Sequence, residues 1–279
     1  MSNLSFYEKK FVYQKTLSLK IGAYNLRFDC SQAHEKRYII RHIFDCLYPQ
    51  ADIDQKLFGF FVKKGDVCLD LGANIGVTAL EMIGAGAKKV LAFEPYEPHV
   101  IRLSNIKCDA IEVYPIAVSD HIGKADMFIS KTHNQGNTIV KGQVNLFPKV
   151  FGDHLKTETV SVRTLDSLLS ETNTDVWKID VEGSENALIR GAIETLKKKP
   201  PRVIICECYN CPHEILNLLG GEWTGLRALL RIDNYELVFS RLSEKIVSRY
   251  YHKTSPMYVF FRKDSIDLIS MMQGFSTRF

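Results

Sequence analysis

Short apolar runs alternate with segments of helical periodicity along the central part of the chain. The runs are almost continuously apolar, which is typical of parallel strands that are buried on both faces. Between the runs, apolar residues recur every three or four positions, as on the buried side of a helix. The pattern predicts an α/β fold with five parallel strands joined by crossover helices. The expected strands are 67–71, 90–94, 111–116, 176–181 and 203–207.

The segments on either side of this pattern have other periods. Residues 11–29 alternate like a β-hairpin that turns at Gly22-Ala23, and residues 35–62 contain two helical stretches. We therefore expect an N-terminal hairpin and helical arm, followed by a Rossmann-like, mostly parallel sheet of seven strands with a terminal antiparallel pair. Beyond residue 207 the expected elements are helices near 213–219 and 224–230 and strands at 235–239 and 257–261.

The changes of period also divide the chain. Residues 1–64 are expected to form an arm or cap, residues 65–265 the main domain, and residues 266–279 a C-terminal tail. Inside the main domain, residues near 130–158 have no strong period. A stretch of this length in a compact domain is usually a functional loop, so we expect a substrate-binding lid there.

The segment Asp70-Leu71-Gly72-Ala73-Asn74-Ile75-Gly76 joins the first expected strand to its helix. Its two glycines let the backbone approach a ligand closely, and the free N–H groups of the helix start point at that ligand. Glu94 ends the next strand 18 residues after Gly76, where an acidic residue can bind ribose hydroxyls. The pattern predicts a nucleoside-binding cradle at the carboxyl edge of the sheet.

The glycine spacing narrows the choice of ligand. Dinucleotide-binding turns have Gly-x-Gly-x-x-Gly, and phosphate loops end in Gly-Lys-Ser/Thr, neither of which occurs here. Asp70 would repel a pyrophosphate, but it suits a ligand with a cationic or amino-acid part. With Glu94-Pro95, the turn resembles the S-adenosylmethionine site of Rossmann-like methyltransferases. An NAD-dependent oxidoreductase is an alternative that NAD binding would reveal.

Acidic residues crowd the end of the fourth strand, in Asp180-Val181-Glu182-Gly183-Ser184-Glu185. Clustered carboxylates are costly unless a cation or a proton lies among them. Methylation of a hydroxyl requires removal of its proton, by a carboxylate with a raised pKa or with the help of a divalent cation. We expect Asp180 to lie nearest the reacting methyl group, with Glu182 as the alternative catalytic residue. Carboxylates that shape a substrate pocket are favoured over a metal site of Asp180, Glu182 and Glu207.

Composition and charge exclude other kinds of partner. The chain has 36 Lys and Arg residues against 32 Asp and Glu, a balance that predicts neither a nucleic-acid nor a membrane partner. No apolar run approaches the length of a membrane span, and the N-terminal segment lacks the apolar core of a signal peptide. Seven scattered cysteines indicate free thiols in a reducing compartment. We therefore expect a soluble, cytoplasmic protein.

Several motifs together resemble the FkbM family of methyltransferases. The resemblance covers about residues 60–208. It implies a Rossmann-like fold, S-adenosylmethionine as methyl donor with S-adenosylhomocysteine as product, and O-methylation of a hydroxyl on a sugar or another small metabolite. The motifs are Asp70-x-Gly-Ala-Asn-x-Gly, Phe93-Glu94-Pro95, Ala117-Val118-Ser119-Asp120, Val162-Arg163-Thr164-Leu165-Asp166, Lys178-Ile179-Asp180-Val181-Glu182-Gly183-x-Glu185 and Arg190-Gly191-Ala192.

The resemblance also implies roles for single residues. Asp70, Gly72, Asn74 and Gly76 are expected to line the methionine half of the cofactor, with Ala73 in the same turn. Glu94, followed by Pro95, is expected to hold the ribose. Ser119 and Asp120 are expected to border the adenine, and Asp180 to lie beside the methyl group.

The acceptor is expected to bind between the lid and the strand ends. The candidate acceptor-binding residues are His133, Asn134 and Asn137 in the lid, and Glu182 and Glu207 at the strand ends. The expected partner is a small molecule, with a saccharide as the example from the family, and the N-terminal arm could support a homo-oligomer. A protein that binds S-adenosylmethionine without catalysis is the remaining alternative, and Asp180→Ala would leave its properties unchanged.

Overall fold

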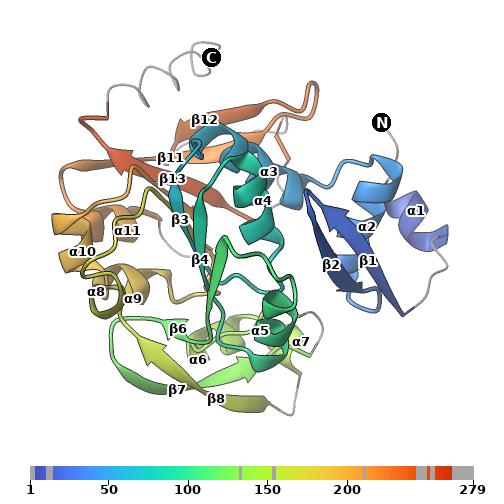
Figure 1. The fold of residues 1–279 in the computed structure, drawn as a ribbon, viewed down its shortest axis with the longest axis horizontal. Helices are drawn as coiled ribbons and strands as arrows, with labels where there is room; N and C mark the ends of the chain where they lie inside the picture. The colour runs from blue at the N-terminus through green and yellow to red at the C-terminus, as the bar shows by residue number, and fades with distance from the viewer. Residues whose placement is uncertain are drawn as a thin grey trace.

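The five apolar runs form five neighbouring parallel strands of one large sheet, as predicted (Figure 1). The computed structural model describes residues 4–10, 15–131, 134–152, 155–209, 212–242, 250–251 and 255–265. Within these residues the large sheet has the order β12-β11-β13-β10-β9-β3-β4-β5. Its parallel strands are β3 (Val67–Leu71), β4 (Lys89–Phe93), β5 (Ile111–Tyr114), β9 (Val176–Ile179) and β10 (Val203–Glu207).

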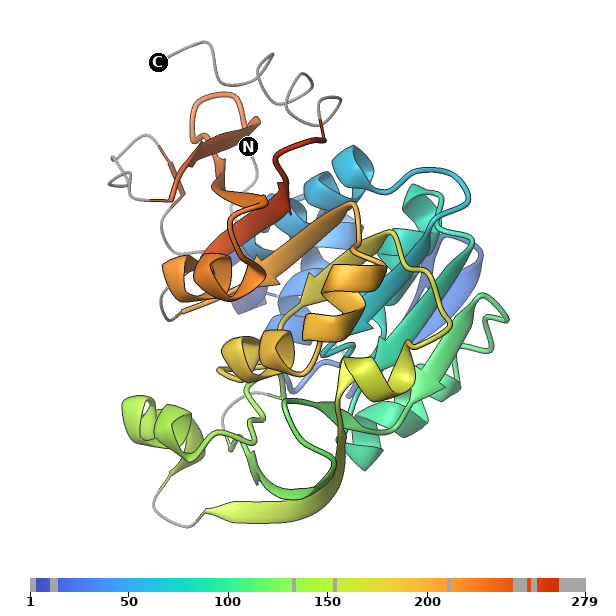
Figure 2. The ribbon, with the colours of Figure 1, turned by 90° about the vertical axis from the view of Figure 1, so that its left-hand side faces the viewer.

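Side chains of the central strands alternate between two hydrophobic cores. Cys68 of β3 faces one core and Leu69 the other, and the paired residues Val90 and Leu91 of β4 divide in the same way. Both faces are therefore covered by helices, which explains why the strands are apolar at nearly every position. The first core packs against α3, α4 and α5, and the second against α8 to α11, which lie in front of the sheet in Figure 2. The helix bounds are α3 (Pro49–Phe61), α4 (Val77–Ala85), α5 (Glu97–Ser104), α8 (Leu165–Leu168), α9 (Glu185–Arg190), α10 (Ile193–Lys198) and α11 (Pro212–Leu219).

The C-terminal part of the sheet differs from the prediction. The expected helix at 224–230 is strand β11 (Trp223–Leu230), which pairs in antiparallel register with β12 (Leu237–Arg241) and β13 (Met257–Arg262). The sheet thus has eight strands among the described residues instead of seven, and two of them, β12 and β13, run antiparallel to the other six. The leucines of this segment fit either period, and pairing on both sides decides for the strand.

The helix expected to run from Ser184 to residue 196 is divided into α9 and α10 at Gly191. A Cβ atom at Gly191 would lie 2.0 Å from the backbone oxygen of Ser119, so the close approach of these two backbones requires glycine. Ser184 occupies the N-cap position of α9, as predicted, but its side chain makes no capping hydrogen bond.

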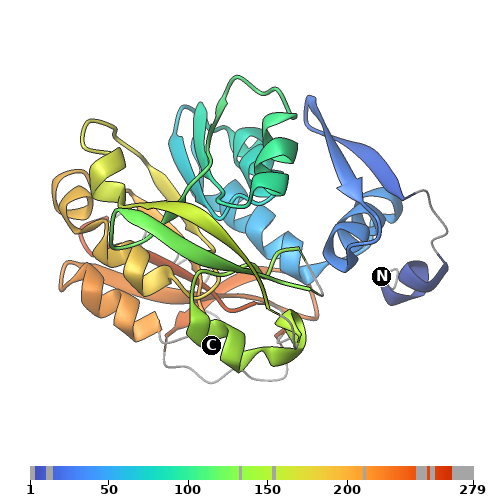
Figure 3. The same cartoon turned by 90° about the horizontal axis from the view of Figure 1, so that it is seen from below.

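A second, small sheet lies beyond the carboxyl ends of the central strands (Figure 3). Its order is β6-β8-β7, and it frames the segment that was predicted to be a lid. The described part of that segment contains two short helices. The bounds are β6 (Ala117–Val118), β7 (Gly123–Ile129), β8 (Lys156–Arg163), α6 (Lys141–Leu146) and α7 (Pro148–Phe151).

The N-terminal arm contains the predicted hairpin and helices. Within it, α3 contributes Leu57, Phe58 and Phe61 to the same core as the central sheet, so this helix packs as part of the main fold. Residues 266–279, the expected tail, lie outside the described residues. No helix in the described part of the chain is long and apolar enough to span a bilayer. The remaining elements are α1 (Leu4–Lys10), β1 (Thr16–Ile21), β2 (Tyr24–Asp29) and α2 (Ala33–Phe44).

Candidate active site

The carboxyl ends of the parallel strands open into a cavity of about 580 Å³. This volume is typical of sites for small ligands and cofactors. The strand ends form its floor, while α2 and α3 of the arm and residues 134–139 of the insertion form its sides. The topology therefore brings together the segments in which the sequence predicts cofactor and acceptor binding.

The turn after β3 forms one wall of the cavity. Gly72 has a φ of +90°, and a Cβ atom there would lie 1.9 Å from the backbone oxygen of Asp180. Only glycine allows the turn to pass so close to the end of β9. Asn74 also has a positive φ, of +48°, and its backbone N–H donates a 2.9 Å hydrogen bond to Oε2 of Glu94.

Glu94 is buried at the end of β4, yet it lines the cavity. Its Oε1 accepts a 2.9 Å hydrogen bond from the backbone N–H of Tyr96, and His99 Nδ1 lies 3.6 Å from the same oxygen. A carboxylate has about four acceptor positions, so two backbone donors leave room for further donors such as hydroxyl groups. The backbone bonds fix the carboxylate at the edge of the cavity.

The predicted cofactor residues divide into two groups. Gly72, Ala73, Asn74, Glu94, Pro95 and Asp180 line the cavity. Asp70 and Gly76 are not among its lining residues: Asp70 lies fully buried beneath the turn, and a Cβ atom at Gly76 would meet Leu103 of α5. Direct contact of these two residues with a ligand is therefore not supported by the geometry. Both residues instead help to maintain the conformation of the turn.

Asp70 takes part in a buried polar cluster beneath the cavity. Its Oδ2 accepts a 2.6 Å hydrogen bond from the hydroxyl of Thr78, and its Oδ1 lies 3.9 Å from Nζ of Lys178. Burial raises the pKa of Asp70 above its ordinary value, although Lys178 and Thr78 oppose this effect. Lys178 is thus the cation around which the carboxylates of the site are arranged.

Ser119 and Asp120 do not line the cavity, so the predicted contact with adenine is not supported. The backbone N–H of Ser119 donates to the oxygen of Arg163 in β8. The carboxylate of Asp120 forms an ion pair of 3.0 Å with Arg190 on the molecular surface. The preceding residues of the same segment, Ile116 to Val118, line the cavity instead.

The end of β9 carries the acidic residues that the sequence places at the reacting centre. Asp180 lines the cavity, and its Oδ2 accepts a 2.9 Å hydrogen bond from Nζ of the buried Lys178. Burial alone lowers the pKa of Lys178, but the carboxylates of Asp180, Asp70 and Asp54 raise it above its ordinary value. The lysine is therefore charged and compensates Asp180.

Glu182 follows in a strained backbone conformation, with a φ of +51°. Such conformations in residues other than glycine are held by their surroundings and occur often at functional sites. Here Thr138 of the insertion donates a 2.7 Å hydrogen bond to the backbone oxygen of Glu182. Burial, Asp180 and Glu185 raise the pKa of the Glu182 carboxyl well above its ordinary value.

Glu207 ends β10 on the same side of the cavity. Burial and the carboxylates of Asp180 and Glu182 raise its pKa well above the ordinary value. Gln50 of α3 donates a 3.4 Å hydrogen bond to Oε2 of Glu207. Next to it, the hydroxyls of Tyr209 and Ser255 lie 2.7 Å apart, and both residues line the cavity.

The insertion contributes Asn134 and Asn137, the candidate acceptor-binding residues, to the cavity wall. The backbone N–H of Ser130 donates a 2.9 Å hydrogen bond to Oδ1 of Asn137, and Nδ2 of Asn137 is buried without a hydrogen-bond partner among the described residues. His133, predicted to bind the acceptor, lies outside the described residues.

Sequence reasoning missed the polar residues that the arm and α4 contribute. Burial raises the pKa of Asp54 on α3 to about 7 and that of Glu81 on α4 to about 8. Both line the cavity, and the hydroxyl of Tyr38 on α2 donates a 3.0 Å hydrogen bond to Glu81. One signal was present in the sequence, because Gln50 and Asp54 are four residues apart and therefore share one side of a helix.

Two observations test whether the cavity suits S-adenosylmethionine. Glu94 has free acceptor capacity for ribose hydroxyls, and the cradle at Gly72 is open only because that residue has no side chain. In addition, carboxylates outnumber cationic side chains along the wall, which suits a ligand with net positive charge. The residues present fit this cofactor. In the described part of the chain, no group of three or more His, Cys, Asp or Glu side chains is arranged to hold a metal ion.

Comparison with known proteins gives one match that bears on identity. A family model described as the methyltransferase FkbM domain matches residues 70–236, which is more than half of the chain. A search of curated protein sequences finds no match.

Solved structures give only distant similarities. The FkbM methyltransferase from Methylobacillus flagellatus KT is 14% identical with a TM-score of 0.44, over 74% of this chain and 50% of that protein, so the chain spans half of its length. An S-adenosylmethionine-dependent methyltransferase from Agrobacterium tumefaciens is 8% identical with a TM-score of 0.46, over 91% of this chain and 72% of that one. An rRNA methylase from Streptococcus thermophilus is 10% identical with a TM-score of 0.40, over 78% of this chain and 98% of that one.

Proposed function

The chain belongs to the FkbM methyltransferase family, and from this premise we propose that it methylates a hydroxyl group of an uncharged, sugar-like small molecule. S-adenosylmethionine is the methyl donor that the family and the cavity support. The observation that carries the acceptor class is the composition of the cavity wall opposite the glycine turn. That wall combines carboxylates, an amide and hydroxyl groups with the aromatic ring of Tyr209.

Glu94 is assigned to the ribose hydroxyls of the donor, and the turn of Gly72, Ala73 and Asn74 to the neighbouring part of the same ligand. When bound, S-adenosylmethionine supplies an electrophilic methyl group for transfer to a nucleophilic oxygen. The protein must therefore orient the acceptor oxygen and take up its proton.

Glu182 is assigned as the proton acceptor. A general base works best when its pKa lies near the working pH, and the pKa of Glu182 is raised toward that range by burial and by Asp180. Asp180, which was the first choice from sequence, already has its Oδ2 engaged by a hydrogen bond from Nζ of Lys178. We assign Asp180 to orienting the acceptor hydroxyl.

The acceptor lies against Glu207, Gln50 and Tyr209 in this proposal. Carboxylate and amide oxygens accept hydrogen bonds from the hydroxyls of a polyol, whereas a phosphate or carboxylate on the acceptor would be repelled by Glu182 and Glu207. The ring of Phe147 packs edge-on against Tyr209, with the centroids 6.2 Å apart, and both residues are exposed. Tyr209, which lines the cavity, offers an apolar surface to the C–H face of a sugar ring.

The proposal is tested by mass spectrometry with S-adenosylmethionine and a panel of saccharides. The panel contains neutral sugars, amino sugars and the phosphate esters of both, so that charge and acceptor atom vary separately. We expect a methyl ether on a neutral sugar and no product from the phosphate ester of the same sugar. Preferred methylation of an amine would contradict the proposed hydroxyl acceptor. Preferred methylation of phosphorylated sugars would contradict the proposed repulsion of anionic acceptors.

A further inference from the structure

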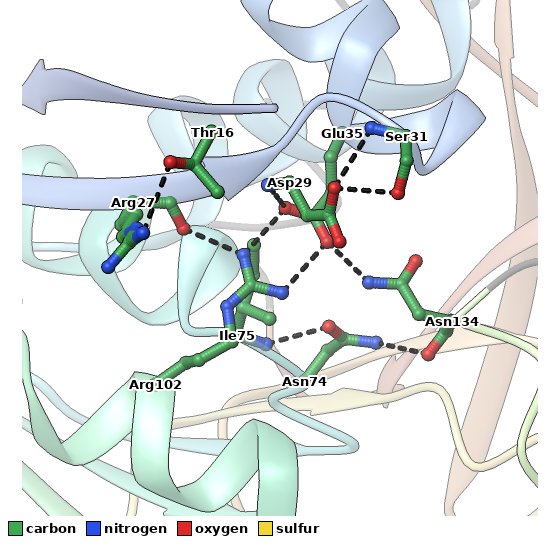
Figure 4. Close-up of polar contacts among 9 residues, drawn as sticks. All are labelled: Thr16, Arg27, Asp29, Ser31, Glu35, Asn74, Ile75, Arg102 and Asn134. Atoms are coloured by element: carbon green, nitrogen blue, oxygen red, sulfur yellow. Dashed lines mark hydrogen bonds and ion pairs between the residues drawn. The ribbon is translucent and has the colours of Figure 1, made fainter. Parts of the chain in front are cut away.

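A hydrogen-bonded path between the arm and the cofactor turn begins at a buried side chain, Glu35 of α2. Its side chain is only 3% exposed, and it lines the same cavity as Glu94. Figure 4 shows that donors from three other segments converge on its carboxylate. No motif in the sequence singled out this residue, and its place in the cavity results from the packing of the arm.

Two of the three segments fix the position of Glu35. Arg102 of α5 binds both carboxylate oxygens, with Nη1 at 2.9 Å from Oε1 and Nη2 at 2.6 Å from Oε2. The backbone N–H of Asp29, at the end of the hairpin, donates a 2.7 Å hydrogen bond to Oε2. A bidentate arginine contact of this kind fixes the plane of a carboxylate and also compensates its charge.

The third segment leads from Glu35 to the cofactor turn. Nδ2 of Asn134 in the insertion donates a hydrogen bond to Oε1 of Glu35, and the backbone oxygen of Asn134 accepts a 3.2 Å hydrogen bond from Nδ2 of Asn74. Asn74 in turn donates its backbone N–H to Glu94. An unbroken chain of hydrogen bonds thus runs from Glu35 through Asn134 and Asn74 to Glu94, and all four residues line the cavity.

Asn74 needs this support because of its backbone conformation. Its φ of +48° lies in the left-handed region, which a residue with a side chain adopts at a cost unless local bonds hold it there. The side chain is held at both ends, since Oδ1 accepts the N–H of Ile75 at 2.8 Å while Nδ2 binds the insertion. If Asn134 moved away, Nδ2 of Asn74 would lose its hydrogen-bond partner. The backbone N–H of Asn74, which orients Glu94, would then be held less firmly.

We propose that Glu35 is a positioning residue of the nucleoside-binding site, which acts through Asn134 and Asn74 on the carboxylate of Glu94. This inference rests on the proposed cofactor. It extends the donor-binding site to the N-terminal arm, whose residues form one side of the cavity. An alternative role, in which Glu35 only fastens the arm to α5, predicts no coupling to Glu94.

The test is a double-mutant cycle of S-adenosylhomocysteine affinity, measured by calorimetry on the ligand-free full chain. Glu35→Gln places an amide N–H₂ group where the carboxylate accepted hydrogen bonds from Arg102, Asn134 and the backbone N–H of Asp29. Two donors then face each other, so these hydrogen bonds cannot all form. We expect this substitution to lower the affinities for S-adenosylhomocysteine and for 5′-methylthioadenosine by the same factor, about tenfold, because both probes carry the ribose. In the Glu94→Gln background the same substitution should lower the affinity less than twofold. Glu112→Gln, in the ion pair with Lys89 at the sheet edge, is the matched control.

The outcomes separate this inference from the proposed function. Additive losses for Glu35→Gln and Glu94→Gln, or unchanged affinity in a folded Glu35→Gln variant, would overturn the positioning role while the cofactor assignment stands. If the wild-type chain binds neither probe, the proposed function itself fails. Should Glu35→Gln not fold, Asn134→Ala removes only the side-chain link and must show the same coupling to Glu94.

Discussion

Gly72 is where the backbone itself forms the wall of the cavity. The space that a side chain would need is filled by the backbone oxygen of Asp180, 1.9 Å from an ideal Cβ position, and backbone cannot rotate away as a side chain can. The positive φ adds strain for any L-residue. The turn and the end of β9 therefore fit together only while residue 72 is glycine.

We expect Gly72→Ala to lower the free energy of unfolding by about 2 kcal/mol or more, because both the contact and the conformation become unfavourable. Chemical denaturation measures this change. Gly84→Ala is the matched control, since a Cβ atom there meets nothing within 4 Å and the residue lies in α4. It should stabilise the protein by about 0.5–1 kcal/mol. Equal effects of the two substitutions would contradict the account of the turn.

Glu182 gives a prediction about pH at the scale of one residue. A proton acceptor must be ionised, so turnover should be full above its raised pKa and fall as the pH drops through that pKa. Glu182→Gln should lower kcat roughly 100-fold and remove this acidic limb of the profile. Steady-state rates across the pH range, on the acceptor found by the saccharide screen, measure both effects. An unchanged acidic limb in the variant would assign the limb to another group.

At the scale of elements, the contact between the arm and α4 carries more ionisable groups than such a buried surface usually holds. Tyr38 of α2, Asp54 of α3 and Glu81 of α4 meet there, and Arg41 compensates only part of the charge. Burial and the neighbouring Asp54 raise the pKa of Glu81 to about 8. The arm therefore closes on the main fold most favourably when these carboxyl groups are protonated.

This arrangement makes stability depend on pH with a definite sign. In the unfolded chain a glutamate ionises near pH 4.5, so between that pH and about 8 the folded state binds the extra proton and stability falls as the pH rises. Glu81→Gln abolishes this loss. We expect it to raise the free energy of unfolding by about 1–3 kcal/mol at pH 9 and to change it little at pH 5.

Denaturant titrations of wild type and Glu81→Gln at both pH values measure the difference. Glu112→Gln serves as control, because that carboxylate is exposed and its pKa is lowered, first of all by a hydrogen bond from Lys89. An equal effect of Glu81→Gln at pH 5 and pH 9 would show that the carboxyl of Glu81 does not titrate in the range derived from its burial.

The elements differ in how far the sequence predicts them. The central strands were predictable because burial on both faces leaves a continuous apolar run, as in Val203–Glu207. Residues 224–230 were predicted to be a helix because their leucines fit a helical period, and the pairing of this segment with the later strand β13 is invisible in the local sequence. Secondary structure decided by such long-range pairing cannot be derived from periodicity.

The same limit applies to the site. Gly72, Glu94 and Asp180 were predictable as cavity residues because each follows a strand directly, and topology alone brings the carboxyl ends of parallel strands together. Glu35 and Asn134 meet across 99 residues of sequence through the packing of the arm, for which no spacing rule exists. Asp70 was assigned to the ligand on its place in the motif, whereas its side chain points beneath the turn to Thr78 and Lys178.

In the whole molecule, three parts of the chain meet in one cavity. The central sheet supplies the cofactor turn and the acidic strand ends, the insertion supplies Asn134 and Asn137, and the arm supplies Glu35, Gln50 and Asp54. Membership of the FkbM family concerns residues 70–236, so the arm lies outside the matched segment. Its contribution to the cavity wall is the feature that the structure adds to the family assignment.

The most direct measurement is calorimetric titration of the ligand-free protein with S-adenosylmethionine and S-adenosylhomocysteine, with NAD as the control ligand. We expect dissociation constants in the micromolar range for both adenosyl ligands, no binding of NAD, and a loss of about 100-fold in affinity for Glu94→Ala. A folded protein that binds neither adenosyl ligand, or that binds NAD instead, would contradict this expectation.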